Sequence, residues 1–178
     1  LDPAVPGLGR NGRNAIVVIG GTNALVDADQ VRAGLADLGP GDVVVCQLEV
    51  PVEAVAAALR QARQAGATAI LNAAPAAAVA ELLGDVDVLV VNEFEAQIVA
   101  GEPEPANDYE VLAKLLAERH DLAAVVTLGS DGAWLASSGQ TTRIAAHPIE
   151  AVDSTGAGDT FVGALAAFLA QGHPIELA

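Results

Sequence analysis

The sequence predicts an α/β fold built around a mostly parallel β-sheet. Segments typical of strands alternate along the chain with segments typical of helices. Most of the strand segments are continuous apolar runs, which is typical of strands that are covered on both faces. We therefore expect three layers, with helices on both faces of the sheet, and a β-hairpin near residues 132–146.

The predicted elements follow one another in a regular order, and glycine and proline mark many of their ends. One helix starts at Pro51 and ends before Gly66, which is the usual asymmetry of helix termini. The predicted strands cover residues 15–20, 42–48, 68–72, 86–91, 123–128, 132–137 and 141–146. The predicted helices cover residues 27–38, 51–65, 76–83, 93–99, 108–120 and 161–170.

The domain organisation is simple. Residues 1–14 are rich in Gly and Pro, and we expect a loop or disordered arm there. Residues 15–178 contain no further linker and are long enough for one α/β core. The chain contains no Met and begins with Leu1, so we expect the sequence to be a trimmed or partly recorded version of a longer one.

Composition excludes several classes of protein. The 8 basic and 23 acidic residues give a formal charge of −15, which argues against binding to nucleic acid or to an anionic membrane. The chain is 52% hydrophobic but only 3% aromatic, so its core must consist of Ala, Val, Leu and Ile. The single cysteine, Cys46, excludes an internal disulfide. Without a visible signal peptide or membrane span, we expect a soluble cytoplasmic protein.

The most informative stretch is a polar, glycine-rich turn at residues 151–160 that leads into an apolar helix. Its Gly156-Ala-Gly158 core lets the backbone approach a ligand closely, and the first amides of a helix form an anion site. Asp159 would lie beside a bound anion, as a base for phosphoryl transfer would. The alternative is an ordinary helix start capped by Asp or Ser.

Further polar residues follow other predicted strands. Because the carboxyl ends of parallel strands share one edge, we expect these residues to lie near Asp159. They are Glu49, Asn72, Asn92, Glu95 and the segment 127–132. Each has a simpler explanation: Glu49 as a loop acid, Asn92 and Glu95 as a capping box, and residues 130–132 as a turn.

Several common catalytic patterns are missing. The sequence contains no dinucleotide-binding glycine fingerprint, no P-loop and no serine nucleophile elbow. The three histidines, His120, His147 and His173, lack partners at ligand spacing, and we interpret them as surface residues.

Four motifs in this order resemble those of the ribokinase (PfkB-type) sugar kinases. The segment Asp153-Ser-Thr-Gly-Ala-Gly-Asp159-Thr-Phe resembles their C-terminal signature, and Asn92-Glu-Phe-Glu95 resembles their Asn-x-x-Glu motif. The loop at 127–132 resembles their nucleotide loop. Cys46-Gln-Leu-Glu49, with Ile70-Leu-Asn-Ala-Ala-Pro75, is similar to ribokinases in particular. The resemblance extends from about Gly12 to the end of the chain.

The resemblance implies a ribokinase-like fold and ATP-dependent phosphorylation of a sugar hydroxyl, most simply that of D-ribose to ribose 5-phosphate. Asp159 would be the base, and the amides of Gly156, Ala157 and Gly158 would form the anion hole. Glu95 would act on Mg²⁺ through water, and Glu49 would bind the sugar. The nucleotide would contact Asn92, Thr127, Leu128, Gly129, Ser130, Asp131, Gly132 and Gly158. Asp153 and the Thr155 carbonyl are similar to ligands of K⁺.

The sequence departs from the family pattern at both ends. The N-terminal part, with the lid and part of the sugar site, and the C-terminal tail are missing from it. We therefore expect this chain alone to bind nucleotide weakly and to turn over little sugar. The alternatives are a kinase of the same superfamily that acts on another sugar or a nucleoside, and a non-catalytic nucleotide-binding fragment. The resemblance also suggests a homodimer formed through the lid.

Overall fold

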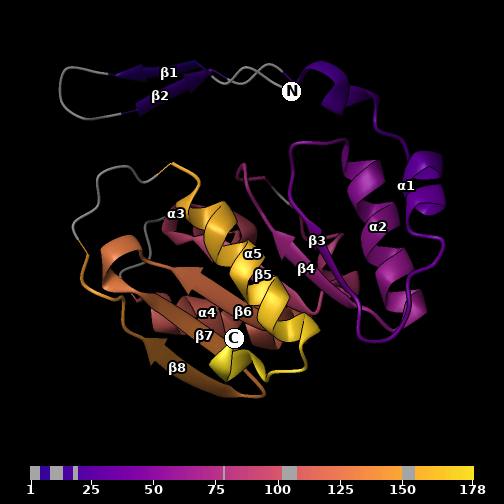
Figure 1. Cartoon of the computed structure of the whole chain (residues 1–178). Coiled ribbons are helices and arrows are strands. Elements are labelled where there is room, and N and C mark those ends of the chain that lie inside the picture. Colours follow the sequence, from indigo (N-terminus) through magenta and orange to yellow (C-terminus); the bar gives the residue numbers. More distant parts are fainter. Residues whose placement is uncertain (1–4, 9–13, 18–19, 78, 102–107, 150–154) are drawn as a thin grey trace.

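A six-stranded sheet forms the centre of the chain (Figure 1). The computed structural model describes residues 5–8, 14–17, 20–77, 79–101, 108–149 and 155–178. The sheet order is β3-β4-β5-β6-β7-β8, and the strands β3 to β6 are parallel whereas β7 and β8 are antiparallel. The strands are β3 (Val43–Cys46), β4 (Thr68–Asn72), β5 (Val88–Asn92), β6 (Ala123–Thr127), β7 (Ala133–Ser137) and β8 (Gln140–Ile144). The predicted fold class and the predicted hairpin are thus confirmed.

Helices cover both faces of the sheet. The parallel strands are neighbours in chain order, so right-handed crossovers place their connecting helices on one face. These helices are α2 (Val52–Ala65), α3 (Glu93–Ala100) and α4 (Tyr109–His120). The last helix, α5 (Ala157–Ala170), packs on the other face and lies in front of the sheet in Figure 1. None of the helices in the described ranges is both long and apolar enough to cross a membrane.

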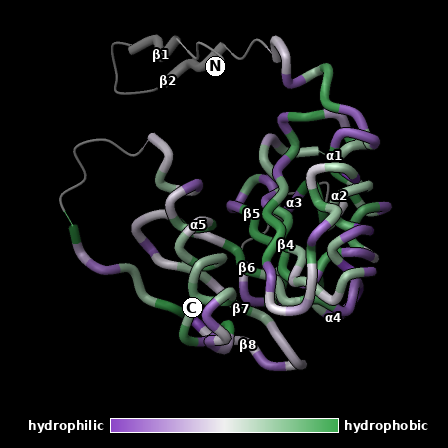
Figure 2. Tube along the Cα trace, turned by 45° about the vertical axis from the view of Figure 1, so that its right-hand side comes forward, coloured by the Kyte–Doolittle hydropathy of each residue, from purple (hydrophilic) through white to green (hydrophobic). Residues whose placement is uncertain are grey.

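The core consists of small aliphatic residues, as the composition predicts. All buried apolar residues in the described part are Ala, Val, Leu or Ile, and they form one cluster on each face of the sheet. In Figure 2 the central strands are accordingly mainly green. Cys46 packs against the larger cluster, and burial raises the pKa of its thiol to about 11. The thiol is therefore protonated at neutral pH and is a poor nucleophile or metal ligand.

Two predicted elements have a different conformation in the structure. The predicted loop at residues 1–14 was wrong where it is described, because β1 (Val5–Leu8) pairs antiparallel with β2 (Asn14–Val17). The helix predicted at 76–83 is also wrong, since its described residues are not helical and a 3-10 turn follows at Leu83–Asp85. The side chains of Val79, Leu82 and Leu83 are buried there, so packing overrides the helix propensity of the alanines.

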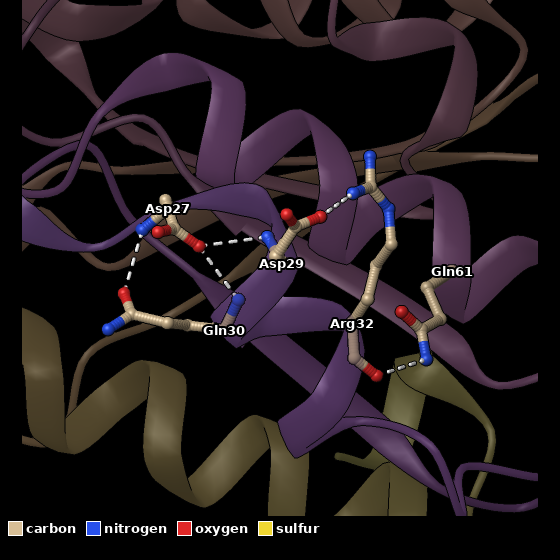
Figure 3. A network of polar contacts seen from close by, with 5 residues as sticks. All are labelled: Asp27, Asp29, Gln30, Arg32 and Gln61. Atoms are coloured by element: carbon tan, nitrogen blue, oxygen red, sulfur yellow. Dashed lines mark hydrogen bonds and ion pairs between the residues drawn. The ribbon is translucent and has the colours of Figure 1, made fainter.

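The first helix, α1 (Ala28–Gly34), is shorter than predicted and depends on local hydrogen bonds (Figure 3). The Asp27 carboxylate accepts hydrogen bonds from the N–H groups of Asp29 and Gln30, and the Gln30 side chain accepts one from the N–H of Asp27. This capping box satisfies amides that the helix itself cannot. At the other end, the Gln61 side chain of α2 reaches the helix carbonyls.

We expect Gln61 to attach α1 to α2. Its Nε2 donates to the Leu35 carbonyl at 2.7 Å and to the Arg32 carbonyl at 3.3 Å. Gln61→Ala should lower the free energy of unfolding by about 1–2 kcal/mol, because these carbonyls lose their donor. Arg32→Ala removes only an exposed ion pair with Asp29 and should cost less than about 1 kcal/mol. Urea denaturation would contradict this account if the two variants lost equal stability.

Candidate active site

Two polar residues end neighbouring strands at the carboxyl edge of the parallel sheet. Asn92 is the last residue of β5 and Thr127 the last of β6, and the two are paired in register. The Thr127 hydroxyl donates a hydrogen bond to the Val91 carbonyl oxygen over 3.3 Å. The register thus places both predicted site residues side by side, at the edge where open α/β sheets bind ligands.

The loop after β6 closes tightly on itself. The N–H of Leu128 donates to the Gly132 carbonyl at 2.7 Å, and the 3-10 turn η3 (Gly129–Asp131) lies between these residues. From β8, the Arg143 guanidinium donates to the carbonyl of Asp131 at 3.0 Å. This small, fixed loop has few side chains that would keep a ligand from its backbone.

Gly132 is the point where the loop touches the end of the hairpin. Its φ is +89°, and a Cβ built there would lie 2.0 Å from the Ile144 carbonyl oxygen and 2.8 Å from the Ala146 nitrogen. No residue with a side chain fits without moving the backbone. Glycine at this position therefore allows residues 144–146 to lie directly against the loop.

Within the described residues, no hydrogen bond engages the first two amides of the helix α5. Gly156 is its N-cap residue, has a φ of +72°, and carries no side chain that could accept hydrogen bonds from the first turn. The next amides, of Ala157 and Gly158, have no partner inside an α-helix. Asp159 is exposed in the same first turn, while the Thr160 hydroxyl donates back to the Gly156 carbonyl at 2.9 Å. The helix dipole adds to the attraction that this end has for an anion.

A cavity of about 440 Å³ joins the loop to the start of α5. Its volume lies in the range of small-molecule sites, which is roughly 300–1,000 Å³. No Asp, Glu, Lys or Arg is among the described lining residues, although the chain carries a charge of −15. They are Thr127, Gly129, Gly132, Ala133, Ile144, Ala145, Ala146, His147, Ala157, Gly158 and Phe161. An anion that entered this cavity would meet the first amides of α5 and, among the described lining residues, no acidic side chain.

Asn92 and Glu95 form the capping box that the sequence predicted as one of two readings. The N–H of Asn92 donates to Glu95 Oε2 at 2.9 Å, and the N–H of Glu95 donates to Asn92 Oδ1 at 2.9 Å. Glu95 is only 7% exposed, and burial raises the pKa of its carboxyl, although hydrogen bonding from the backbone and the side chain of Asn92 lowers this pKa in part. The pair therefore starts α3 and also holds a buried carboxylate close to the β5–β6 edge.

Glu49 lies further along the same edge. It follows β3, its side chain is exposed, and its backbone N–H donates a hydrogen bond to Oε1 of Gln47 at 2.9 Å. The N–H of Leu48 donates to the Ala74 carbonyl at 2.8 Å, which joins the loop after β3 to the loop after β4. Asn72, at the end of β4, donates from Nδ2 to the Val90 carbonyl at 3.1 Å.

Not every predicted site residue is brought together. Several predicted site residues are not among the described residues that line the cavity at the α5 start: Glu49, Asn92, Glu95, Leu128, Ser130, Asp131, Gly156 and Asp159. Asp153 lies outside the described residues, whereas Thr155 is described and exposed. The part of the chain that the structure describes contains no cluster of three or more His, Cys, Asp or Glu side chains suited to a metal ion.

The structure adds two residues that sequence reasoning missed. Phe161 and His147 both line the cavity, although His147 is exposed, as expected of a surface histidine. The pairing of Ala133 with Ile144 brings the end of β8 back to the loop and carries His147 with it. The predicted hairpin was the only signal in the sequence that could have indicated this return.

A larger cavity, of about 560 Å³, lies at the opposite edge of the sheet and contains none of the predicted site residues. Its lining includes Lys114, Glu118 and Asp121, together with the hairpin turn at Ser138. We place the candidate site at the smaller cavity, because the first amides of α5 and a glycine-rich loop meet there.

The comparisons with known proteins agree with the α/β fold described above. Residues 8–178 match the model of the pfkB family carbohydrate kinases. A ribokinase of Staphylococcus aureus is 36% identical over 156 residues, which cover 86% of this chain and 51% of that protein. A deoxyribokinase of Salmonella typhi is 31% identical over 171 residues, which cover 94% of this chain and 56% of that protein.

A solved structure provides the same correspondence in three dimensions. The Arabidopsis thaliana ribokinase, solved in complex with ribose and ATP, superposes with a TM-score of 0.79 at 29% identity. The match covers 98% of this chain and 59% of that one. The chain thus spans about half the length of the curated relatives that it matches.

Proposed function

Because this chain belongs to the pfkB family of carbohydrate kinases, we propose that it supplies the nucleotide site and the phosphoryl-transfer residues of an ATP-dependent sugar kinase. The observation that carries the proposal is the cavity that joins the loop at 127–132 to the first amides of α5. A glycine-rich loop and a helix N-terminus are what a polyphosphate requires of a backbone. The predicted partners of the chain are therefore ATP and a small sugar.

Three groups at the start of α5 have separate roles in the proposed phosphoryl transfer. The amides of Ala157 and Gly158, with Gly156 at the turn, stabilise the negative charge on the transferred phosphoryl group. The Asp159 carboxylate accepts the proton of the attacking sugar hydroxyl, since it stands in the first helical turn and is exposed to an incoming substrate.

We propose that Mg²⁺ and K⁺ bind to residues at the edges of this site. Mg²⁺ takes one or two carboxylates together with substrate phosphates and water. Glu95 supplies a carboxylate for that purpose, and the N–H of Asn92 fixes its position by donating to Oε2. When bound, Mg²⁺ would neutralise phosphate charge. For K⁺ we propose Asp153 and the Thr155 carbonyl, beside the turn that presents the anion-binding amides.

We propose D-ribose as the acceptor, with ribose 5-phosphate as the product. The relatives that are named ribokinases support this choice, as does the exposed Glu49 carboxylate at the end of β3, which is available to sugar hydroxyls. The deoxyribokinase relative favours deoxyribose as the second candidate.

A phosphorylation assay across ribose, deoxyribose, fructose and adenosine tests the proposal. It is best done on the natural polypeptide that contains this sequence, with ATP as the donor and product identified by mass spectrometry. We expect the highest kcat/KM with ribose. Phosphorylation of adenosine alone would show that the acceptor is a nucleoside and not a sugar. ATP binding without transfer to any acceptor would show that the protein is a non-catalytic nucleotide-binding module.

Glu95→Gln separates the structural role of this residue from its proposed metal role. The Gln amide oxygen can still accept from the N–H of Asn92, so the cap persists and stability at pH 7 should stay within about 1 kcal/mol of the wild type. The loss of the negative charge should raise the Mg²⁺ concentration needed for half-maximal activity. An unchanged Mg²⁺ requirement in this variant would remove Glu95 from the metal site.

The stability of Glu95→Gln relative to the wild type should change with pH in a defined direction. Burial raises the pKa of Glu95 in the folded state above its ordinary value, so ionisation of this group disfavours folding. The contribution of the Glu95 carboxyl to the free energy of unfolding is therefore present below the unfolded pKa and is lost as pH rises through the folded pKa. Glu95→Gln does not ionise, so its stability relative to the wild type should increase as pH rises from below 4.5 towards neutrality. Urea titrations at several pH values measure this difference.

A further inference from the structure

We propose that His147 forms the wall against which the nucleobase packs, and that it is a specificity-determining residue of the site. The proposal rests on the proposed function, because it assumes that the cavity takes a nucleotide. His147 lines that cavity together with the apolar residues that follow β8.

The cavity has two kinds of wall. One wall, at Ala157 and Gly158, offers the first amides of α5 and suits the phosphates. The other, at residues 144–147, offers hydrocarbon and one imidazole ring. A nucleotide has the same two parts, a polyanionic chain and a flat, mostly apolar base, so the base belongs against residues 144–147.

The second wall has exposed apolar side chains that a bound ligand would cover. Ile144 is 40% exposed and Phe161, which also lines the cavity, is 37% exposed. Exposed apolar side chains that gather in a cavity are typical of a binding surface. The position of this wall is fixed, because Gly132 holds the Ile144 carbonyl and Ala146 against the loop.

His147 is the only described side chain in the lining that combines an aromatic face with uncommitted polar atoms. The other polar side chain, that of Thr127, already donates to the Val91 carbonyl. No hydrogen bond, ion pair or ring contact engages the His147 ring within the described residues. The imidazole is therefore available to stack on a base or to hydrogen-bond with its edge.

The other histidines offer a matched control. The ring of His173 lies 5.5 Å from that of Phe168 near the far end of α5, and it does not line the cavity. His173→Ala therefore removes an exposed histidine from the same chain without touching the proposed base wall.

The test compares two probes, ATP and inorganic tripolyphosphate, in calorimetric titrations of the polypeptide that contains this chain. We expect His147→Ala to weaken ATP binding about tenfold, since removal of one base-stacking ring typically costs this much. Tripolyphosphate has no base, so its affinity should change less than about twofold. His147→Phe should retain most of the affinity for ATP, and His173→Ala should bind both probes as the wild type does.

The outcomes separate this inference from the proposed function. If the wild type binds ATP but His147→Ala binds it equally well, or if the variant weakens both probes alike, the base wall is wrong while the nucleotide site stands. A His147→Phe variant as weak as His147→Ala would also overturn stacking. If the wild type binds neither probe, the proposed function fails, and this inference fails with it.

Discussion

Asp159→Asn is expected to reduce phosphoryl transfer by about 10²–10⁴-fold in kcat, because the amide cannot accept the proton of the attacking hydroxyl. The substitution is nearly isosteric and lies on the exposed first turn of α5. Its structural cost is therefore limited to the lost helix-dipole interaction, about 0.3–1 kcal/mol. ATP affinity should stay close to that of the wild type, so the loss appears in kcat.

The control for this prediction is an acid that is remote from the site. Glu118 is exposed on α4 and lines the cavity at the opposite edge of the sheet, so Glu118→Gln should keep full activity. Steady-state kinetics on both variants, with the thermal midpoint measured alongside, decides the matter. If Asp159→Asn kept wild-type kcat, the assignment of the base would be wrong.

Gly132→Ala is expected to destabilise the protein by about 3 kcal/mol or more, and to disrupt the nucleotide cavity. The new Cβ would meet the Ile144 carbonyl oxygen at 2.0 Å, which is a backbone atom that cannot rotate away. The φ of +89° adds the strain of a left-handed conformation. Either the loop or the segment after β8 must move, and both line the cavity.

A second glycine with positive φ isolates the effect of the clash. Gly139, in the hairpin turn, has a φ of +76° but nothing within 4 Å of the position of its Cβ. Gly139→Ala should therefore cost only the backbone strain, roughly 1–2 kcal/mol. Urea denaturation of both variants compares the two costs, and equal losses would show that the contact with Ile144 is unimportant.

Much of the fold could be predicted because local signals and burial agree. Pro51 and Gly66 bracket α2, and Gly66 adopts the left-handed conformation that ends it. The segment Thr68–Asn72, with its apolar centre at residues 69–71, indicated β4 with the observed bounds. Where local propensity and burial conflict, the prediction failed. The alanine-rich segment 76–83 has helical propensity, but its apolar residues are buried in another conformation.

The candidate site could be predicted only to the level of a shared sheet edge. Polar residues after parallel strands must converge there, which placed Asn92 and Thr127 as neighbours. The start of α5 at Ala157, four residues before the predicted helix, depends on the left-handed Gly156. The part played by His147 could not be foreseen, because it follows from the close contact between Gly132 and the end of β8.

The central claim, that nucleotide binds between the loop after β6 and the start of α5, is tested most directly by backbone amide chemical shifts during an ATP titration. The account predicts that the largest shifts fall at residues 128–133 and 156–161, with further shifts near His147. The cavity at the opposite edge, near Lys114 and Ser138, should stay unchanged. Shifts confined to that opposite cavity, or no shifts at saturating ATP, would contradict the account.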